Sequence, residues 1–247
     1  MIRTGISSLA LILSLAAVPA FAEEAAPAAT AAAAPTVAEA DAFVARAEKE
    51  LADFSTPAQQ AAWINATYIT DDTDAIAAKF GAEGTEMGVR FALEAAKYAA
   101  LPGLSFDTKR KIDILRSGLT LPAPTTPGAA TELSTIVTRM SSGYGKGRGT
   151  LDGKPINGSD IEAAMGTTRD PAKTKEMWVS WHDNVGAPMR GDYVRQVEIA
   201  NKGAQELGYA DVGALWRSGY DMKPDEFAAL TDKLWKQVEP LYVALHT

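Results

Sequence analysis

The chain has 247 residues, of which 47% are hydrophobic and 22% are charged, and its formal net charge is −7. This hydrophobic share excludes wholesale disorder, and the acidic balance argues against a nucleic-acid-binding protein, which would need a basic face. Cysteine is absent and histidine occurs only at His182 and His246, so disulfides and a self-contained zinc enzyme of the usual kind are excluded.

Residues 1–22 have the pattern of a secretory signal peptide. Arg3 supplies the positive start, residues 6–18 are apolar or small, and Ala20-Phe21-Ala22 forms an A-x-A cleavage site. The apolar run is too short and too interrupted for a membrane-spanning helix, and no later run is long enough for one. We therefore expect export to the periplasm or the medium, with cleavage after Ala22 and no membrane anchor afterwards.

Residues 23–35 are rich in alanine, contain two prolines and lack large side chains. Such a segment cannot bury enough apolar surface to offset the entropy of the chain, so it is predicted to be a disordered tether. The folded domain is expected over residues 36–247.

From Thr36 onward, the sequence predicts an all-α fold. Ser, Thr or Asp caps, some followed by proline at the first helical position, predict helix starts at Thr36–Glu39, Thr56–Gln59, Thr126–Pro127, Ser159–Glu162 and Asp170–Pro171. Residues 143–158 form the one loop-rich stretch, in which a short hairpin is expected at Leu151–Lys154.

Two late helices show their apolar faces clearly. In the first, which ends at Gly208, Glu198 and Lys202 are spaced to pair on the polar side, and the apolar positions are Tyr193, Val197, Ala200, Ala204 and Leu207. In the second, residues 223–246, the apolar stripe comprises Phe227, Leu230, Leu234, Val238, Leu241 and Leu245. This stripe continues to the last residues without a glycine cap or a polar tail. We therefore expect the chain to be a truncated part of a larger domain.

Several residues carry a functional and a structural interpretation. The glycine-rich run 142–150 does not match a phosphate-binding loop, so a flexible connection is expected. Asp71, Asp72 and Asp74 could bind a hard cation, but acidic residues in a first helical turn are favoured by the helix dipole.

His182 could act as an acid or base together with Glu162 or Asp183. The spacing of these residues does not form a catalytic set, so we expect His182 to be a packed or hydrogen-bonded histidine. The late aromatic residues are expected on helices, most of them in the core: Trp178, Trp181, Trp216, Tyr220, Trp235 and Tyr242.

A series of segments, in order along the chain, resembles one enzyme family. They are Trp63–Thr70, Met140–Tyr144, Ala164–Asp170, Trp178–Asp183, Val185–Arg190, Tyr193–Glu198, Leu207–Gly213, Trp216–Tyr220 and Gln237–His246. Together they resemble the M2 zinc metallopeptidases, the angiotensin-converting-enzyme-like peptidyl-dipeptidases, in a bacterial form. The resemblance extends from about Ala40 to the last residue.

The resemblance implies a large all-helical domain with a deep cleft, in which zinc is held by H-E-x-x-H and a downstream Glu. It implies removal of C-terminal dipeptides from oligopeptides. The H-E-x-x-H motif does not occur in this sequence, which covers roughly the first third of such a domain. We therefore expect zinc outside this chain, and neither catalytic nor metal-binding residues within it.

Three positions can be compared with site residues of the family. Tyr220 matches the tyrosine of a chloride site in animal members, so it is a candidate anion-binding residue. His182 replaces an arginine of another chloride site, and Ser141 replaces a glutamate that approaches the substrate. Chloride is therefore a candidate cofactor. The peptide preference of the animal members cannot be transferred to this chain. The alternative interpretation is a non-catalytic helical interaction module in the periplasm. A longer reading frame containing H-E-x-x-H would decide for the enzyme.

Overall fold

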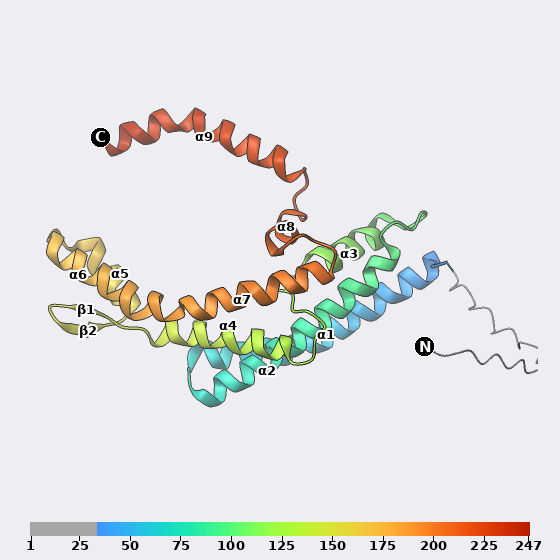
Figure 1. The fold of residues 1–247 in the computed structure, drawn as a ribbon, viewed down its shortest axis with the longest axis horizontal. Coiled ribbons are helices and arrows are strands. Elements are labelled where there is room, and N and C mark those ends of the chain that lie inside the picture. The colour runs from blue at the N-terminus through green and yellow to red at the C-terminus, as the bar shows by residue number, and fades with distance from the viewer. Residues whose placement is uncertain (1–33) are drawn as a thin grey trace, which may run out of the picture. The chain divides into compact units, whose positions relative to one another are not determined.

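The structure is a computed structural model that describes residues 34–247. The predicted signal peptide and almost all of the predicted tether lie outside the described residues. The described part is helical apart from one two-stranded hairpin, which confirms the all-α prediction (Figure 1). Its helices are α1 (Val37–Thr67), α2 (Asp71–Ala95), α3 (Phe106–Ser117), α4 (Ala129–Lys146), α5 (Gly158–Thr167), α6 (Pro171–Trp181), α7 (Ala187–Glu206), α8 (Val212–Arg217) and α9 (Pro224–His246).

Three shorter features complete the described part of the chain. A single 3-10 turn, Ala96–Tyr98, follows α2, and a π-helical segment, His182–Gly186, joins α6 to α7. The strands β1 (Gly149–Leu151) and β2 (Lys154–Ile156) pair in the antiparallel direction. Asp152 and Gly153, with φ of 52° and 72°, form the turn between them, as the predicted hairpin requires.

Two predicted helix starts are confirmed by their caps. Thr36 and Glu39 form a reciprocal capping box, in which the Thr36 N–H donates to Glu39 Oε2 at 2.7 Å and the Glu39 N–H donates to Thr36 Oγ1 at 3.3 Å. Asp170 Oδ1 accepts from the Ala172 N–H at 2.9 Å, and Pro171 occupies the first helical position. These side chains satisfy backbone donors that a helix start leaves without an intrahelical partner.

Other predicted starts were wrong. No helix begins at Thr56, because α1 continues through Pro57 and keeps its packing on α2. Helix α5 is capped by Asn157, whose Oδ1 accepts from the Asp160 N–H at 2.9 Å, rather than by Ser159. Helix α4 begins at Ala129, after Gly128 has turned the chain with a φ of 84°, a conformation that favours glycine.

The predicted flexible connection was also too long. Helix α4 continues to Lys146, so Gly143 and Gly145 are helical, and the turn out of the helix starts at Gly147. Gly145 permits a close approach between α4 and the segment before α2. A Cβ atom there would lie 2.5 Å from Ile69 Cδ1.

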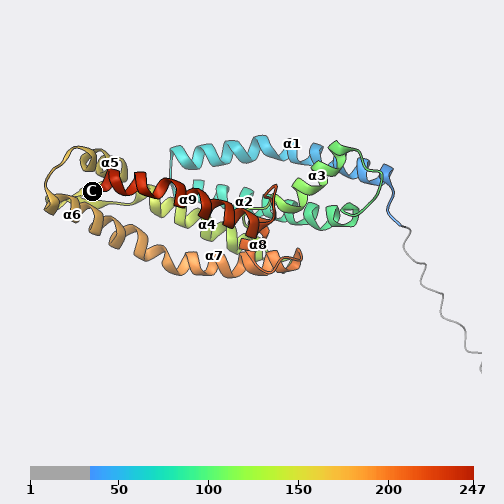
Figure 2. The same ribbon diagram turned by 90° about the horizontal axis from the view of Figure 1, so that it is seen from above.

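Among residues 34–247, the core consists of three buried clusters along a helical bundle, by which we mean α1, α2, α3, α4, α7 and α8. The first includes Phe43 and Phe91, whose rings meet edge to face with centroids 6.3 Å apart. The second joins α2, α4 and α7 through residues such as Leu133 and Ile199, and the third joins α7 to α8 around Leu215. Figure 2 shows α1, α2, α4 and α7 running lengthwise beside one another.

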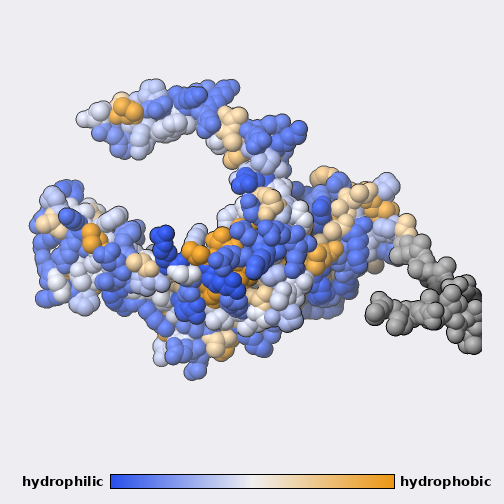
Figure 3. Space-filling model, in the orientation of Figure 1, coloured by the Kyte–Doolittle hydropathy of each residue, from blue (hydrophilic) through white to orange (hydrophobic). Residues whose placement is uncertain are grey.

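The expectation that most late aromatic residues pack in the core was wrong. Trp181 is half-buried, whereas the other five are at least 44% exposed: Trp178, Trp216, Tyr220, Trp235 and Tyr242. Helix α9 forms where expected, but none of its residues is buried, and Figure 3 shows apolar side chains on its surface. Helical spacing predicts an apolar face, but it does not say what covers that face.

Candidate functional site

Tyr220, the candidate anion-binding residue, lies in the segment between α8 and α9 rather than on a helix. Its ring centroid is 4.5 Å from that of Phe227, and the residue is 44% exposed. It lines a cavity of about 560 Å³ in which Arg110 and Arg116 supply positive charge and Asp113 and Asp221 supply negative charge. This lining is mixed in charge, and the anion-binding role of Tyr220 stays a prediction.

His182 opens the π-helical segment between α6 and α7. Its Nδ1 lies 2.6 Å from the carbonyl oxygen of Trp178, and the two ring centroids are 4.1 Å apart. This confirms the expected hydrogen-bonded histidine. Within residues 34–247, no hydrogen bond joins His182 to Glu162 or Asp183, so the structure does not assemble the acid–base group.

The C-terminal end of α4 brings two family-like segments together. Tyr144 packs its ring edge to face on Trp181, with centroids 5.5 Å apart. Ser141, which the sequence resemblance places opposite a glutamate of the family, is exposed, whereas Ser142 is buried. Sequence reasoning found both segments but not their contact, because helical spacing contains no information on which helices meet.

Asp74 is the most enclosed of the three aspartates at the start of α2. Burial raises the pKa of its carboxyl, but hydrogen bonds with Asn65 and Ser142 and the charge of Lys146 leave that pKa below its ordinary value. The Asn65 Nδ2 donates to Asp74 Oδ1 at 2.7 Å, and Lys146 Nζ lies 3.7 Å from Oδ2. This network joins the α1–α2 corner to the end of α4. It lies beside a groove of about 850 Å³ between α2 and α4.

Helix α6 holds the hairpin through its polar side chains. The two oxygens of Glu176 accept from the N–H groups of Asp152 at 3.1 Å and Gly153 at 2.9 Å. Ser180 Oγ accepts from the Thr150 N–H at 2.8 Å. Hydrogen bonds, that from the Gly153 N–H foremost, lower the pKa of the Glu176 carboxyl. Sequence analysis missed Glu176, because no local pattern marks a carboxylate that binds a distant turn.

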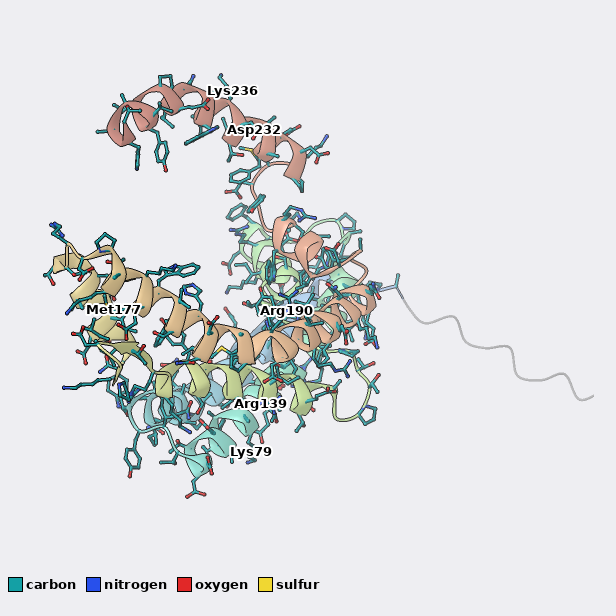
Figure 4. All side chains as sticks on the ribbon, turned by 60° about the vertical axis from the view of Figure 1, so that its left-hand side comes forward. Lys79, Arg139, Met177, Arg190, Asp232 and Lys236 are labelled. Carbon is teal, nitrogen blue, oxygen red and sulfur yellow. The ribbon has the colours of Figure 1, made fainter. Side chains whose placement is uncertain are left out.

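Ion pairs join α4 to α7. Arg139 forms a two-pronged contact with Asp192, with Nε to Oδ2 at 2.7 Å, and Figure 4 shows Arg139 on α4 beside α7. The Arg139 guanidinium holds the pKa of the Asp192 carboxyl below its usual range. The predicted Glu198–Lys202 pair was wrong, because Glu198 pairs with Arg195 at 3.1 Å.

The residues present do not fit a zinc centre. Residues 34–247 contain no group of three or more His, Asp or Glu side chains placed to hold a metal ion. His182 and His246 are each held by a backbone carbonyl one turn earlier, with Nδ1 2.6 Å from Trp178 O and 2.8 Å from Tyr242 O. We therefore assign no catalytic step to zinc within these residues. No helix in this part of the chain combines the length and apolarity needed to span a bilayer.

Comparison with known proteins identifies the family. The model of the peptidase M2 family, described as angiotensin-converting enzyme, matches residues 34–247. The mouse (Mus musculus) angiotensin-converting enzyme-like protein Ace3 is 30% identical over 189 residues, which cover 76% of this chain and 25% of that protein. The angiotensin-converting enzyme of Haematobia irritans exigua is 26% identical over 206 residues, covering 80% of this chain and 33% of the relative. The chain thus spans a quarter to a third of these curated relatives. It belongs to the peptidase M2 family.

Proposed function

We propose that this chain is the N-terminal portion of an exported zinc metallopeptidase that removes C-terminal dipeptides from oligopeptides. The observation that carries the proposal is the family match along residues 34–247, combined with coverage of only a quarter to a third of the relatives. The signal-peptide pattern of residues 1–22 supports export.

In this proposal, residues 34–247 supply scaffold and the zinc-binding residues lie in polypeptide beyond Thr247. A zinc ion in such enzymes polarises the peptide carbonyl and activates water, and the donors for it are not among the described residues. The apolar side chains exposed on α9, such as Leu241 at 65% and Leu245 at 74%, agree with a helix that packs on further structure.

The second candidate is a helical interaction module without catalysis. The same exposed face of α9 favours it, because an uncovered apolar face is also typical of a surface that binds another protein. The two candidates differ in what the gene encodes after codon 247.

The test is to sequence the gene beyond that codon and to express the whole reading frame. We expect H-E-x-x-H with a downstream Glu, and one bound zinc per polypeptide measured by atomic emission. The matched control replaces the Glu of H-E-x-x-H by Gln, which should keep the zinc and lose dipeptide release. A stop codon directly after Thr247, with a stable monomeric product, would favour the interaction module.

A further inference from the structure

The hairpin, α5 and α6 pack on one another more than on the bundle. We call residues 149–181 the distal module. Met177 and Ile161 are buried inside it, and the hairpin is fixed to α6 by the Glu176 and Ser180 hydrogen bonds. None of the three buried clusters of the bundle includes a residue of this module in the described part of the chain.

Two connections join the module to the bundle, and they lie against each other. One is Gly147-Arg148, between α4 and β1, and the other is the π-helical segment His182–Gly186. A Cβ atom on Gly147 would lie 2.7 Å from Val185 Cγ2, and Asn184 Nδ2 donates to the Arg148 carbonyl oxygen at 3.2 Å. Because both connections lie at one place, a rotation of the module there would leave the packing inside the module and inside the bundle unchanged.

Outside these connections, little holds the module to the bundle. Among the aromatic pairs, side-chain hydrogen bonds and ion pairs of residues 34–247, only the Tyr144–Trp181 ring pair joins them. Figures 1 and 4 show the module at one end of the bundle, with Met177 on α6 well away from Arg139 on α4. Tyr144 is 63% exposed and Trp181 is half-buried, so this edge-to-face pair is a weak contact between the module and the bundle.

We infer that the distal module moves as a rigid body about a hinge formed by Gly147 and the π-helical segment His182–Gly186. The wide turn of a π-segment interrupts the regular ladder of helical hydrogen bonds, and such segments coincide with kinks and functional sites. Gly186 adds backbone freedom at the junction with α7. Rotation of the distal module about this hinge separates Tyr144 from Trp181 and so changes the surface at the end of α4.

Distances between paired spin labels test the hinge on the intact chain. The chain has no cysteine, so labels bind only at introduced sites. The module–bundle pair is Lys175→Cys with Thr135→Cys, the bundle pair is Thr135→Cys with Lys202→Cys, and the module pair is Lys154→Cys with Lys175→Cys; all four positions are exposed. We expect a broad or two-peaked distance distribution for the module–bundle pair and narrow distributions for both internal pairs.

A stiffened hinge provides the matched comparison. A Cβ atom at Gly186 meets nothing within 4 Å, so Gly186→Ala reduces backbone freedom without a clash. Gly191→Ala, equally free of contacts but inside α7, is the control. The module–bundle distance distribution should become narrower with Gly186→Ala and should stay broad with Gly191→Ala. A module–bundle distribution as narrow as the two internal ones would overturn the inference, as would equal effects of the two alanines.

Discussion

At the scale of single residues, Glu176 links α6 to the turn of the hairpin. Its carboxylate accepts two backbone N–H groups, and its pKa lies below the ordinary value chiefly because of the Gly153 N–H. Since the folded pKa is below the unfolded one, the stabilising effect is fully present above the unfolded pKa of about 4.3 and is lost as the pH falls through the folded value.

We therefore predict that Glu176→Gln increases hydrogen exchange at the Asp152 and Gly153 amides, measured as protection factors at neutral pH. Acidification of the unaltered chain through the lowered pKa of the folded Glu176 carboxyl should cause the same change. Glu162→Gln is the control, because Glu162 is an exposed residue of α5 that forms no side-chain hydrogen bond or ion pair within residues 34–247. Unchanged protection in Glu176→Gln would refute the role given to this carboxylate.

Gly203 marks the closest approach between α7 and the segment before α4. A Cβ atom there would lie 2.3 Å from the Pro122 carbonyl oxygen, which is backbone and cannot rotate away. Gly203→Ala should lower the free energy of unfolding by roughly 1–3 kcal/mol, measured by urea denaturation. Gly166→Ala meets nothing within 4 Å and should have no comparable cost. Equal stabilities of these two variants would contradict this packing.

At the scale of the elements, Pro57 shows where local signals fail. Proline is favoured at a first helical position, yet α1 continues through it. Here proline removes one backbone hydrogen bond inside a helix, so Pro57→Ala should raise the free energy of unfolding by about 1–3 kcal/mol. Pro171→Ala is the control, because Pro171 stands at the first position of α6 and should change stability little. A loss of stability in Pro57→Ala would show that this proline is required where it stands.

Much of the element level follows from the sequence. The all-α class, the caps at Thr36 and Asp170, the positive-φ turn at Gly208 just after α7 and the hairpin turn are all set by residues within a few positions. The same local information misplaced the starts near Ser159 and Pro127, where a neighbouring Asn or Gly takes the cap. Contacts such as Tyr144–Trp181 depend on residues far apart in the chain, so no short pattern reveals them.

At the scale of the whole molecule, α9 has an apolar face that the described residues leave exposed. Its residues from Phe227 to Leu245 include Leu234 at 49% exposure and Leu241 at 65%. Burying one such side chain contributes about 1.5–3 kcal/mol. Several uncovered side chains therefore compare with the whole stability of a domain, roughly 5–15 kcal/mol.

We predict that residues 23–247, expressed alone, have a folded helical bundle but a loosely packed α9, bind a hydrophobic dye, associate readily, and show no peptidase activity with zinc added. Circular dichroism, dye fluorescence and light scattering measure the first three properties. Residues 23–222, which lack α9, are the matched control and should lose much of the dye binding and association. A cooperative thermal transition without dye binding in residues 23–247 would contradict the packing argument.

We proposed that this chain is part of a zinc peptidyl-dipeptidase, and one measurement tests that proposal most directly. The polypeptide encoded by the whole reading frame is incubated with a blocked tripeptide, and the released dipeptide is quantified before and after zinc chelation. We predict dipeptide release that chelation abolishes and added zinc restores, with none from residues 23–247 under the same conditions. Zinc-dependent release by residues 23–247 alone, or no release by the zinc-loaded whole polypeptide, would contradict it.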